Sequence, residues 1–398
     1  MNILYISLSD PRSINHGGEQ RYHFIWEGLK KSGDVYTIVP VHRYTHERCD
    51  QQAKIYWVCL ERRYSPFLVL ERLLNRFLPS FTLSSAYSLK RLCRFGIPKP
   101  DVCVVRPASL ANSLCLWKLA PTCVDMDDIP LAEFDIETMV CGNSLIRRLR
   151  RLVLKHVQET ACRKAARVWI ADEAEFKRFP GVPVSFVPNI PVPPLPDFAD
   201  EIGSSDTLFF IGYLAHGPNQ VALNWFLTTI WTDLKKVFPD LKFEICGGGL
   251  PERFKKAWAD YPDVTLRGFV KDLRPCYQKA LAILTPMRIG SGSCLKVLEA
   301  LRMGRVLIST QQGLRGIRPE YRNPSNGILP FEDLPSLKEA IVTLRNSDRV
   351  LLQRAAVSFV QLRNTQDFID MSVGKDVAAV AKAINGRCDN RQHRNGVI

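Results

Sequence analysis

Several features that mark particular classes of protein are missing from this chain of 398 residues. It has no apolar run of about 18 residues, so no transmembrane helix is expected. The first residues, MNILYISL, lead directly into a strand pattern, so no secretory signal is expected. The twelve cysteines form no CxxC pair, and most lie in apolar runs, as do Cys59, Cys103, Cys123 and Cys246. Buried free thiols in a cytoplasmic protein are therefore expected.

Acidic residues are scarce relative to basic ones, with 40 Asp and Glu against 54 Lys and Arg, a formal net charge of +14. Such a charge favours nucleic acid, an anionic membrane or a phosphate-rich substrate as partner. No helix-turn-helix, zinc finger or RNP-type aromatic motif accompanies it, so no nucleic-acid partner is expected.

The basic residues are most concentrated in the predicted helix 144–167, where eight Lys and Arg accompany one acidic residue, Glu159. This helix is predicted to contact anionic headgroups, which would place the protein peripherally on the inner face of the cell membrane. Residues 61–97 mix arginines with leucines and aromatics. That stretch is predicted either to lie on a bilayer or to form two ordinary surface helices.

Residues 281–316 read as strand, glycine loop, helix and strand. Ser293 is expected at the N-cap of the helix 295–303, whose free N–H groups would suit a phosphate. Lys296 adds positive charge in the first turn. Glu299 follows on the same helix face and can bind a pair of sugar hydroxyls. The alternative is a solvated helix face that carries an ordinary ion pair.

This stretch resembles the donor-site segment of glycosyltransferase family 4, through RIGSGS at 288–293, LKVLEA at 295–300 and Ser309-Thr310. The family contains retaining, sugar-nucleotide-dependent enzymes of the α/β GT-B fold, in which two Rossmann-like doubly wound domains face each other across a cleft. The resemblance implies that Glu299 holds the donor ribose and that the loop faces the diphosphate. It implies catalytic roles for Arg288 and Lys296, which would stabilise the departing diphosphate. It also implies that the enzyme uses neither a metal nor another cofactor. The donor-binding residues that it implies in the loop are Gly290, Ser291, Gly292 and Ser293.

Other glycines and an aromatic residue of the second half complete the predicted donor site. Gly212 follows the predicted strand 208–211, and Gly247 follows the strand 242–246. Phe269 and Val270 resemble the segment of the family that holds the nucleobase, although core packing explains Phe269 equally well.

Strands predicted throughout the first half indicate another doubly wound sheet. Gly17 and Gly18 lie between its first strand and a helix from Gln20, and are predicted to be on the acceptor side; a tight turn is the alternative. Asp127 and Asp128 follow the strand 122–126. Asp127 is predicted to be catalytic by orienting the attacking hydroxyl, and Asp128 to contact the acceptor. A helix cap or loop carboxylate is the alternative for both. Asp125 and Asp127 also spell DxD, a metal-binding pattern of a different transferase fold.

The predicted division of the chain is an acceptor-side domain at 1–195, a donor domain at 205–370, a helix at 371–386 that crosses back to the first domain, and a basic disordered tail at 387–398. A proline-rich linker joins the domains.

The predicted function is transfer of a sugar from a nucleoside-diphosphate sugar to a glycan or lipid-linked glycan, with retention, in polysaccharide or glycoconjugate biosynthesis. One alternative is a catalytically impaired GT-B subunit. Ser291, where many relatives have an acidic residue, Cys294, and the missing Arg and Lys after Gly212 suggest it. The other alternative is a sugar-nucleotide epimerase.

Overall fold

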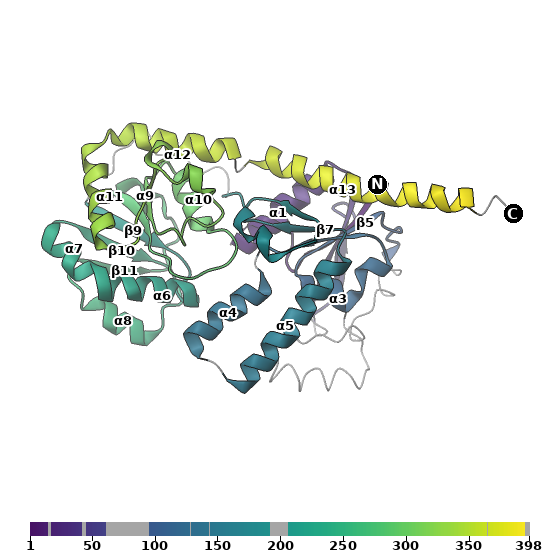
Figure 1. Cartoon of the computed structure of the whole chain (residues 1–398), viewed down its shortest axis with the longest axis horizontal. Coiled ribbons are helices and arrows are strands. Elements are labelled where there is room, and N and C mark those ends of the chain that lie inside the picture. The colour runs from purple at the N-terminus through teal and green to yellow at the C-terminus, as the bar shows by residue number, and fades with distance from the viewer. Residues whose placement is uncertain are drawn as a thin grey trace. The chain divides into compact units, whose positions relative to one another are not determined.

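The computed structural model describes residues 1–14, 17–41, 45–60, 95–127, 129–142, 144–191, 206–363 and 365–394. The chain divides into two compact units, each with its own sheet (Figure 1). Unit 1 comprises residues 1–135, 142–188 and 366–398, and unit 2 comprises residues 136–141 and 189–365. None of the described helices has both the length and the apolar character that crossing a membrane requires.

Unit 1 is built on a sheet of eight strands in the order β3-β4-β2-β1-β5-β6-β7-β8. The strands are β1 Asn2–Ile6, β2 Asp34–Pro40, β3 Arg48–Asp50, β4 Ile55–Val58, β5 Val102–Val105, β6 Thr122–Asp125, β7 Arg167–Ile170 and β8 Val184–Phe186. All neighbours are parallel except β3 and β4. The strand order reverses between β1 and β5, which is the point where doubly wound sheets bind ligands beyond the carboxyl ends of their strands.

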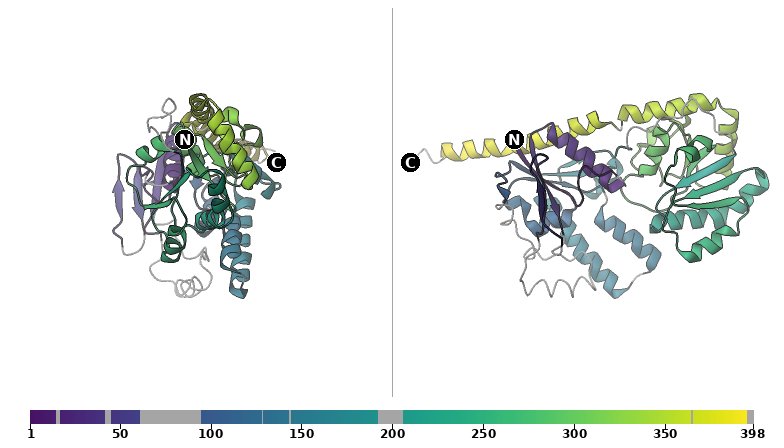
Figure 2. Two further views of the ribbon diagram at one scale, coloured as in Figure 1. Left: turned by 90° about the vertical axis from the view of Figure 1, so that its left-hand side faces the viewer. Right: turned by 180° about the vertical axis from the view of Figure 1, so that it is seen from behind.

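The helices of unit 1 include two that pack against each other from opposite ends of the chain. They are α1 Gly17–Lys30 and α13 Gln366–Arg394, which lie side by side in Figure 2. Trp169 Nε1 donates a hydrogen bond of 2.9 Å to Asp376 Oδ2 of α13, and both side chains are buried. Residues 387–394 of the predicted tail continue α13. The other helices are α3 Ala108–Leu114, α4 Pro130–Cys141, whose residues 136–141 are assigned to unit 2, and α5 Leu145–Lys164.

Unit 2 contains a parallel sheet of six strands in the order β11-β10-β9-β12-β13-β14, which reverses between β9 and β12. The strands are β9 Thr207–Ile211, β10 Lys242–Cys246, β11 Val264–Gly268, β12 Ala282–Thr285, β13 Leu307–Ser309 and β14 Ile328–Pro330. The helices are α6 Gly217–Phe226, α7 Thr232–Val237, α8 Glu252–Ala259, α9 Arg274–Lys279, α10 Leu295–Arg302, α11 Leu334–Asn346 and α12 Arg349–Arg363. This order is that of a Rossmann-type sheet.

The strands predicted from apolar runs are confirmed, and the four cysteines singled out in those runs are buried thiols. Gly327 adopts a left-handed φ of 70°, and the chain then enters β14 parallel to β13. Most of the stretch 61–97 and of the linker lies outside the described residues.

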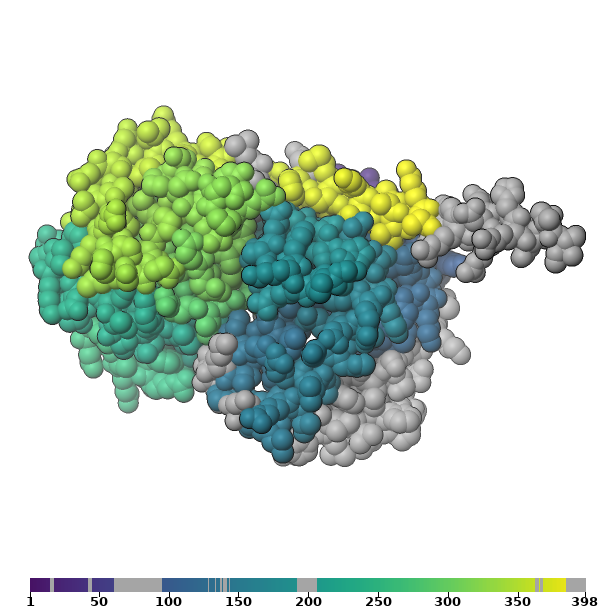
Figure 3. Space-filling view, viewed as in Figure 1, coloured from purple at the N-terminus to yellow at the C-terminus, as the bar shows by residue number. Residues whose placement is uncertain are grey.

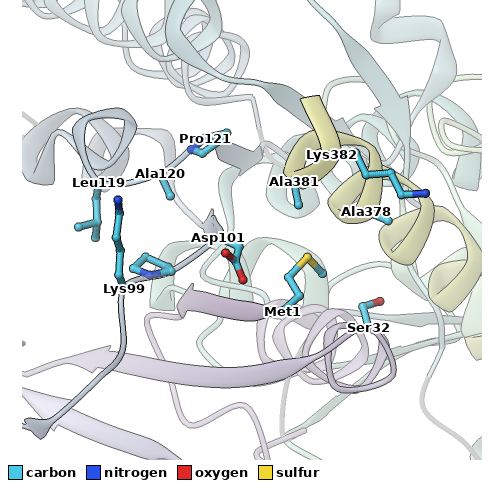
Figure 4. Close-up of a pocket in the computed structure, with 11 residues that line it drawn as sticks. Met1, Ser32, Lys99, Asp101, Leu119, Ala120, Pro121, Ala378, Ala381 and Lys382 are labelled. Carbon is cyan, nitrogen blue, oxygen red and sulfur yellow. The ribbon is translucent and has the colours of Figure 1, made fainter. Parts of the chain in front are cut away.

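A cavity of about 740 Å³ lies in unit 1 at the amino ends of the strands (Figure 4). Its walls come from Met1, from Lys99 and Asp101 before β5, and from Ala378 and Lys382 of α13. Ligands of such sheets bind at the opposite, carboxyl ends. The cavity is therefore separate from the predicted site residues.

Candidate functional site

The predicted donor-site residues converge at the switch point of the sheet in unit 2. Gly212 directly follows β9, and the loop 288–293 follows β12 and leads into α10. Because β9 and β12 are neighbours in a parallel sheet, their carboxyl ends meet at one edge. Side chains from two distant parts of the sequence are brought together there.

Lys296 is a partly buried cation of α10 at this edge. Its Nζ donates to Asn219 Oδ1 at 2.6 Å and lies 4.3 Å from the centroid of the Phe210 ring. A Cβ at Gly212 would come within 2.9 Å of this Nζ, so the glycine makes room for the ammonium group. The pKa of Lys296 is lowered to about 8, mainly by burial and to a smaller extent by the nearby charge of Arg315. No carboxylate forms an ion pair with Lys296 in the described part of the chain.

Glu299 lies one helical turn after Lys296 and is also partly buried. Burial raises the pKa of Glu299 to about 7, against the opposing effect of Lys296. Within the residues that the structure describes, no hydrogen bond or ion pair reaches its carboxylate. A partly buried carboxylate whose oxygens are not used by the protein is available to accept hydrogen bonds from the hydroxyl groups of a ligand.

Arg315 fixes the backbone of the loop 288–293 through a hydrogen bond. Its Nε donates to the carbonyl oxygen of Ser291 at 3.0 Å, and the Gln312 side chain donates to that of Gly290 at 2.9 Å. A Cβ at Gly290 would lie 2.6 Å from Arg315 Cζ, so only glycine permits this approach. The loop is therefore fixed with a guanidinium against its backbone.

The end of this loop differs from the expected cap. Cys294, not Ser293, is the N-cap of α10, and its side chain makes no capping bond. The Ser293 hydroxyl instead accepts a hydrogen bond of 2.8 Å from the amide of Asn189. Gly292 has a left-handed φ of 59°, which lets the loop turn into the helix. The first N–H groups of α10 therefore lack a side-chain cap.

Arg288 is exposed and is held by its neighbours. Its NH1 lies 3.1 Å from Glu332 Oε2, and its guanidinium lies 4.5 Å from the centroid of the Trp225 ring. Glu332 also accepts a hydrogen bond of 2.6 Å from the backbone N–H of Gln311. A phosphate at Arg288 must therefore compete with Glu332.

Two aromatic side chains stand in solvent beside the glycine turn after β10. Phe269 is 81% exposed and Tyr213 is 67% exposed. A Cβ at Gly249 would lie 2.8 Å from the Tyr213 ring, and one at Gly247 would lie 1.7 Å from the Gly212 carbonyl oxygen. Core packing therefore does not explain Phe269, whereas the next residue, Val270, packs partly against the core.

Asp127, the predicted catalytic residue of unit 1, belongs to a buried charge cluster. Arg21 of α1 bonds both carboxylate oxygens of Asp125, with distances of 2.6–3.1 Å, and donates to the carbonyl oxygen of Val187. Asp127 Oδ2 lies 3.6 Å from Arg106 NH2 and 4.0 Å from Arg21 Nε. Both carboxylates of the DxD pattern are thus matched by arginines of the same unit.

The remaining acceptor-side predictions are placed as follows. Gly17 and Gly18 form the first turn of α1 and not a separate loop before Gln20. Asp128 lies outside the described residues.

Sequence reasoning assigned no role to Asn219, Arg315 or Arg21. Each is distant in sequence from its partner and meets it only when the chain folds, so the local sequence carries no signal for these pairs. His216 lies in the loop after Gly212, where Arg and Lys are missing, and its pKa is lowered by burial and by the charges of Lys296 and Arg315. It therefore adds little positive charge at neutral pH.

Known proteins resemble this chain in part of its sequence and in its fold. Residues 205–347 match the family model described as Glycosyl transferases group 1. The structure is similar to that of HepE from Anabaena in complex with UDP and glucose, with a TM-score of 0.60 and 11% identity, covering 94% of this chain and 99% of that one. The two sheets and this likeness show the GT-B fold.

Two other similarities cover less of the relative. A mutant of S. aureus TarM in complex with Fondaparinux, alpha-GlcNAc-glycerol and UDP matches with a TM-score of 0.51 and 15% identity, over 73% of this chain and 58% of that one. A Klebsiella pneumoniae protein described as an uncharacterized 44.6 kDa protein in cps region is 29% identical over 116 residues, 27% of this chain. The chain spans only 30% of the length of that curated relative. Unit 2 thus matches a glycosyltransferase family model, in a chain of GT-B fold.

Proposed function

We propose that the protein is a sugar-nucleotide-dependent glycosyltransferase that holds its donor on unit 2. One observation carries the proposal: a partly buried lysine without an ion pair and a partly buried carboxylate without a hydrogen-bond partner, as far as the described residues go, lie one turn apart at the switch point. Lys296 and Glu299 together complement a ligand that carries negative charge beside hydroxyl groups. A nucleoside diphosphate has both, because its phosphates adjoin a ribose.

The donor would contact the site through its diphosphate, its ribose and its nucleobase. The diphosphate accepts hydrogen bonds from the Lys296 ammonium and from the uncapped N–H groups of α10. Arg315, which contacts the loop 288–293, adds positive charge nearby. Glu299 accepts hydrogen bonds from the ribose hydroxyls. The base lies at the exposed ring of Phe269. The UDP in the HepE and TarM complexes supports uridine as the nucleoside.

The transfer step needs stabilisation of the leaving diphosphate. Lys296 and the N–H groups of α10 stabilise the negative charge that develops on the diphosphate. Arg288 contributes as well once its ion pair with Glu332 is broken. We propose that the anomeric configuration is retained and that the reaction uses no metal. The carboxylates of the DxD pattern are paired with arginines instead. The proposed acceptor is a glycan or lipid-linked glycan in polysaccharide or glycoconjugate biosynthesis. An excess of basic residues, which suits an anionic acceptor or membrane, supports this class.

The test is thermal unfolding and titration calorimetry of the whole protein with UDP, GDP, ADP and their glucose esters. A ligand at about a hundred times its Kd should stabilise the protein by about 2.7 kcal/mol. Lys296→Met should weaken that ligand by at least about tenfold, since a charge-assisted hydrogen bond is lost. The matched control, Lys256→Met on α8, should bind normally.

The outcomes separate the alternatives. Wild-type protein that is folded yet binds none of these nucleotides overturns the proposal and favours an impaired subunit. Conversion of the donor sugar without any acceptor favours an epimerase. Release of nucleoside diphosphate only when acceptor is present supports transfer.

A further inference from the structure

The first half of α5 carries an unusual cluster of exposed apolar side chains. Leu145 is 74% exposed, Leu149 is 49% exposed and Leu152 is 62% exposed, with Ile146 beside them at 46%. Fourteen large hydrophobic residues are exposed in the described chain, and these four fall within eight consecutive positions. Single exposed apolar residues are ordinary, but a contiguous patch marks an interaction site.

The three leucines form one stripe along the helix. Their spacing of four and then three residues places them on a single face. The second half of the helix is anchored in unit 1, where Ala161 and Cys162 join the hydrophobic core and Asn112 Nδ2 donates to the carbonyl oxygen of Val157 at 2.6 Å. The leucine stripe therefore belongs to a helix held firmly at its other end. In Figure 3 the blue-teal atoms of α5 lie at the surface of unit 1.

Arginines lie between the leucines along the sequence and give this half of the helix its positive charge. Arg147 and Arg148 have side chains without a hydrogen bond or ion pair to any residue that the structure describes. Arg151, by contrast, is held by Asp135 of α4 at 2.6 Å. Glu159 is the one acidic residue of the helix, and it lies beyond the stripe. The exposed half of α5 thus combines an apolar face with positive charge and no acid.

We propose that this half of α5, residues 145–152, docks on an anionic lipid bilayer. The leucines would enter the boundary between headgroups and acyl chains, while the arginines would meet anionic headgroups. A second copy of the chain fits less well as occupant, because it would bring the arginines of two helices together without opposing charge. The inference does not depend on the transfer reaction, since no residue of the donor site takes part.

The test is sedimentation of the whole protein with vesicles of phosphatidylcholine, with and without phosphatidylglycerol. Wild-type protein should bind the anionic vesicles and release from them as salt rises. Replacing Leu145, Leu149 and Leu152 together by Gln should lower binding at least about tenfold, because their insertion is lost. Arg147→Gln with Arg148→Gln should lower it about fivefold for each arginine.

Matched controls exist elsewhere in the chain. Gln at Val342, Leu351 and Met371 removes three apolar side chains that are 46%, 67% and 67% exposed, and should leave binding unchanged. Lys236→Gln with Lys256→Gln removes the same charge from α7 and α8 and should weaken binding less than the arginine pair. Stabilisation by nucleotide, if wild type shows it, should persist in the leucine variant.

Two results would overturn the inference. One is wild-type protein that ignores anionic vesicles or binds neutral ones equally well. The other is a leucine variant that still binds like wild type, which would place any membrane contact elsewhere. A dimer in solution that the leucine variant abolishes, without vesicle binding by either protein, would assign the stripe to self-association and also exclude a lipid partner.

Discussion

Both units have charged residues near the carboxyl ends of their sheets, yet the charges are arranged differently. In unit 1, Arg21 and Asp125 are both 2% exposed and bond each other through several atoms. In unit 2, Lys296 and Glu299 are buried enough to shift both pKa values, but neither forms an ion pair in the described residues. A saturated cluster stabilises the fold, whereas an unsaturated one is suited to a ligand. Unit 2 is accordingly the better candidate for donor binding.

Removing one partner of the saturated cluster should have the largest effect. Arg21→Met leaves the Asp125 carboxylate buried without its cation, and should lower the free energy of unfolding by about 3–5 kcal/mol. Urea unfolding of the purified variant measures this loss. Adding Asp125→Leu should recover much of the stability, because a buried pair can be replaced by apolar groups. A single variant as stable as wild type would contradict a structural role for the pair.

The exposed aromatic ring of unit 2 should show the opposite behaviour. Phe269→Ala should leave the urea midpoint unchanged, since Phe269 is 81% exposed. If its ring stacks on the nucleobase, the variant should lose about 1–3 kcal/mol of nucleotide affinity. Titration calorimetry measures this loss, with Phe176→Ala, another exposed phenylalanine, as control. Unchanged affinity would place the base away from Phe269.

The smallest effect concerns Glu299. Its pKa is raised from 4.5 to about 7, so the folded state favours the protonated carboxyl, and wild-type protein loses stability as the pH rises through this range. Glu299→Gln should therefore gain about 1 kcal/mol at about pH 8 and almost nothing at about pH 4, after allowance for partial exposure.

Urea midpoints across this range, with exposed Glu339→Gln as control, measure the gain. If Glu299 holds the ribose, the same variant should also bind nucleotide more weakly, because an amide replaces its carboxylate. A stability gain of equal size at every pH would show that ionisation of Glu299 is not its cause.

The sequence predicted the sheets well because parallel strands covered on both faces are continuous apolar runs, as in β12 and β6. It missed β3, since Arg48, Cys49 and Asp50 show no apolar pattern at the sheet edge. It singled out Lys296 and Glu299 as candidates because the loop and the helix that carry them are contiguous in the sequence.

Long-range pairing was beyond the reach of local patterns. Arg21 looks like a solvent-facing residue of an amphipathic helix until Asp125, 104 residues away, is placed beside it. Arg315 likewise becomes part of the site only when its loop folds behind Ser291. Such contacts follow from topology, which a single sequence does not contain.

The anchoring of α13 by Trp169 and Asp376 has a consequence for synthesis of the protein on the ribosome. Unit 1 starts with β1 but contains residues 366–394, which are translated after all of unit 2. Unit 2 can therefore fold while unit 1 still lacks the helix that packs on α1. A nascent chain arrested before α13 would expose the apolar surface that this helix covers, including the surroundings of Trp169. The N-terminal unit should thus be the last to become resistant to proteases during translation.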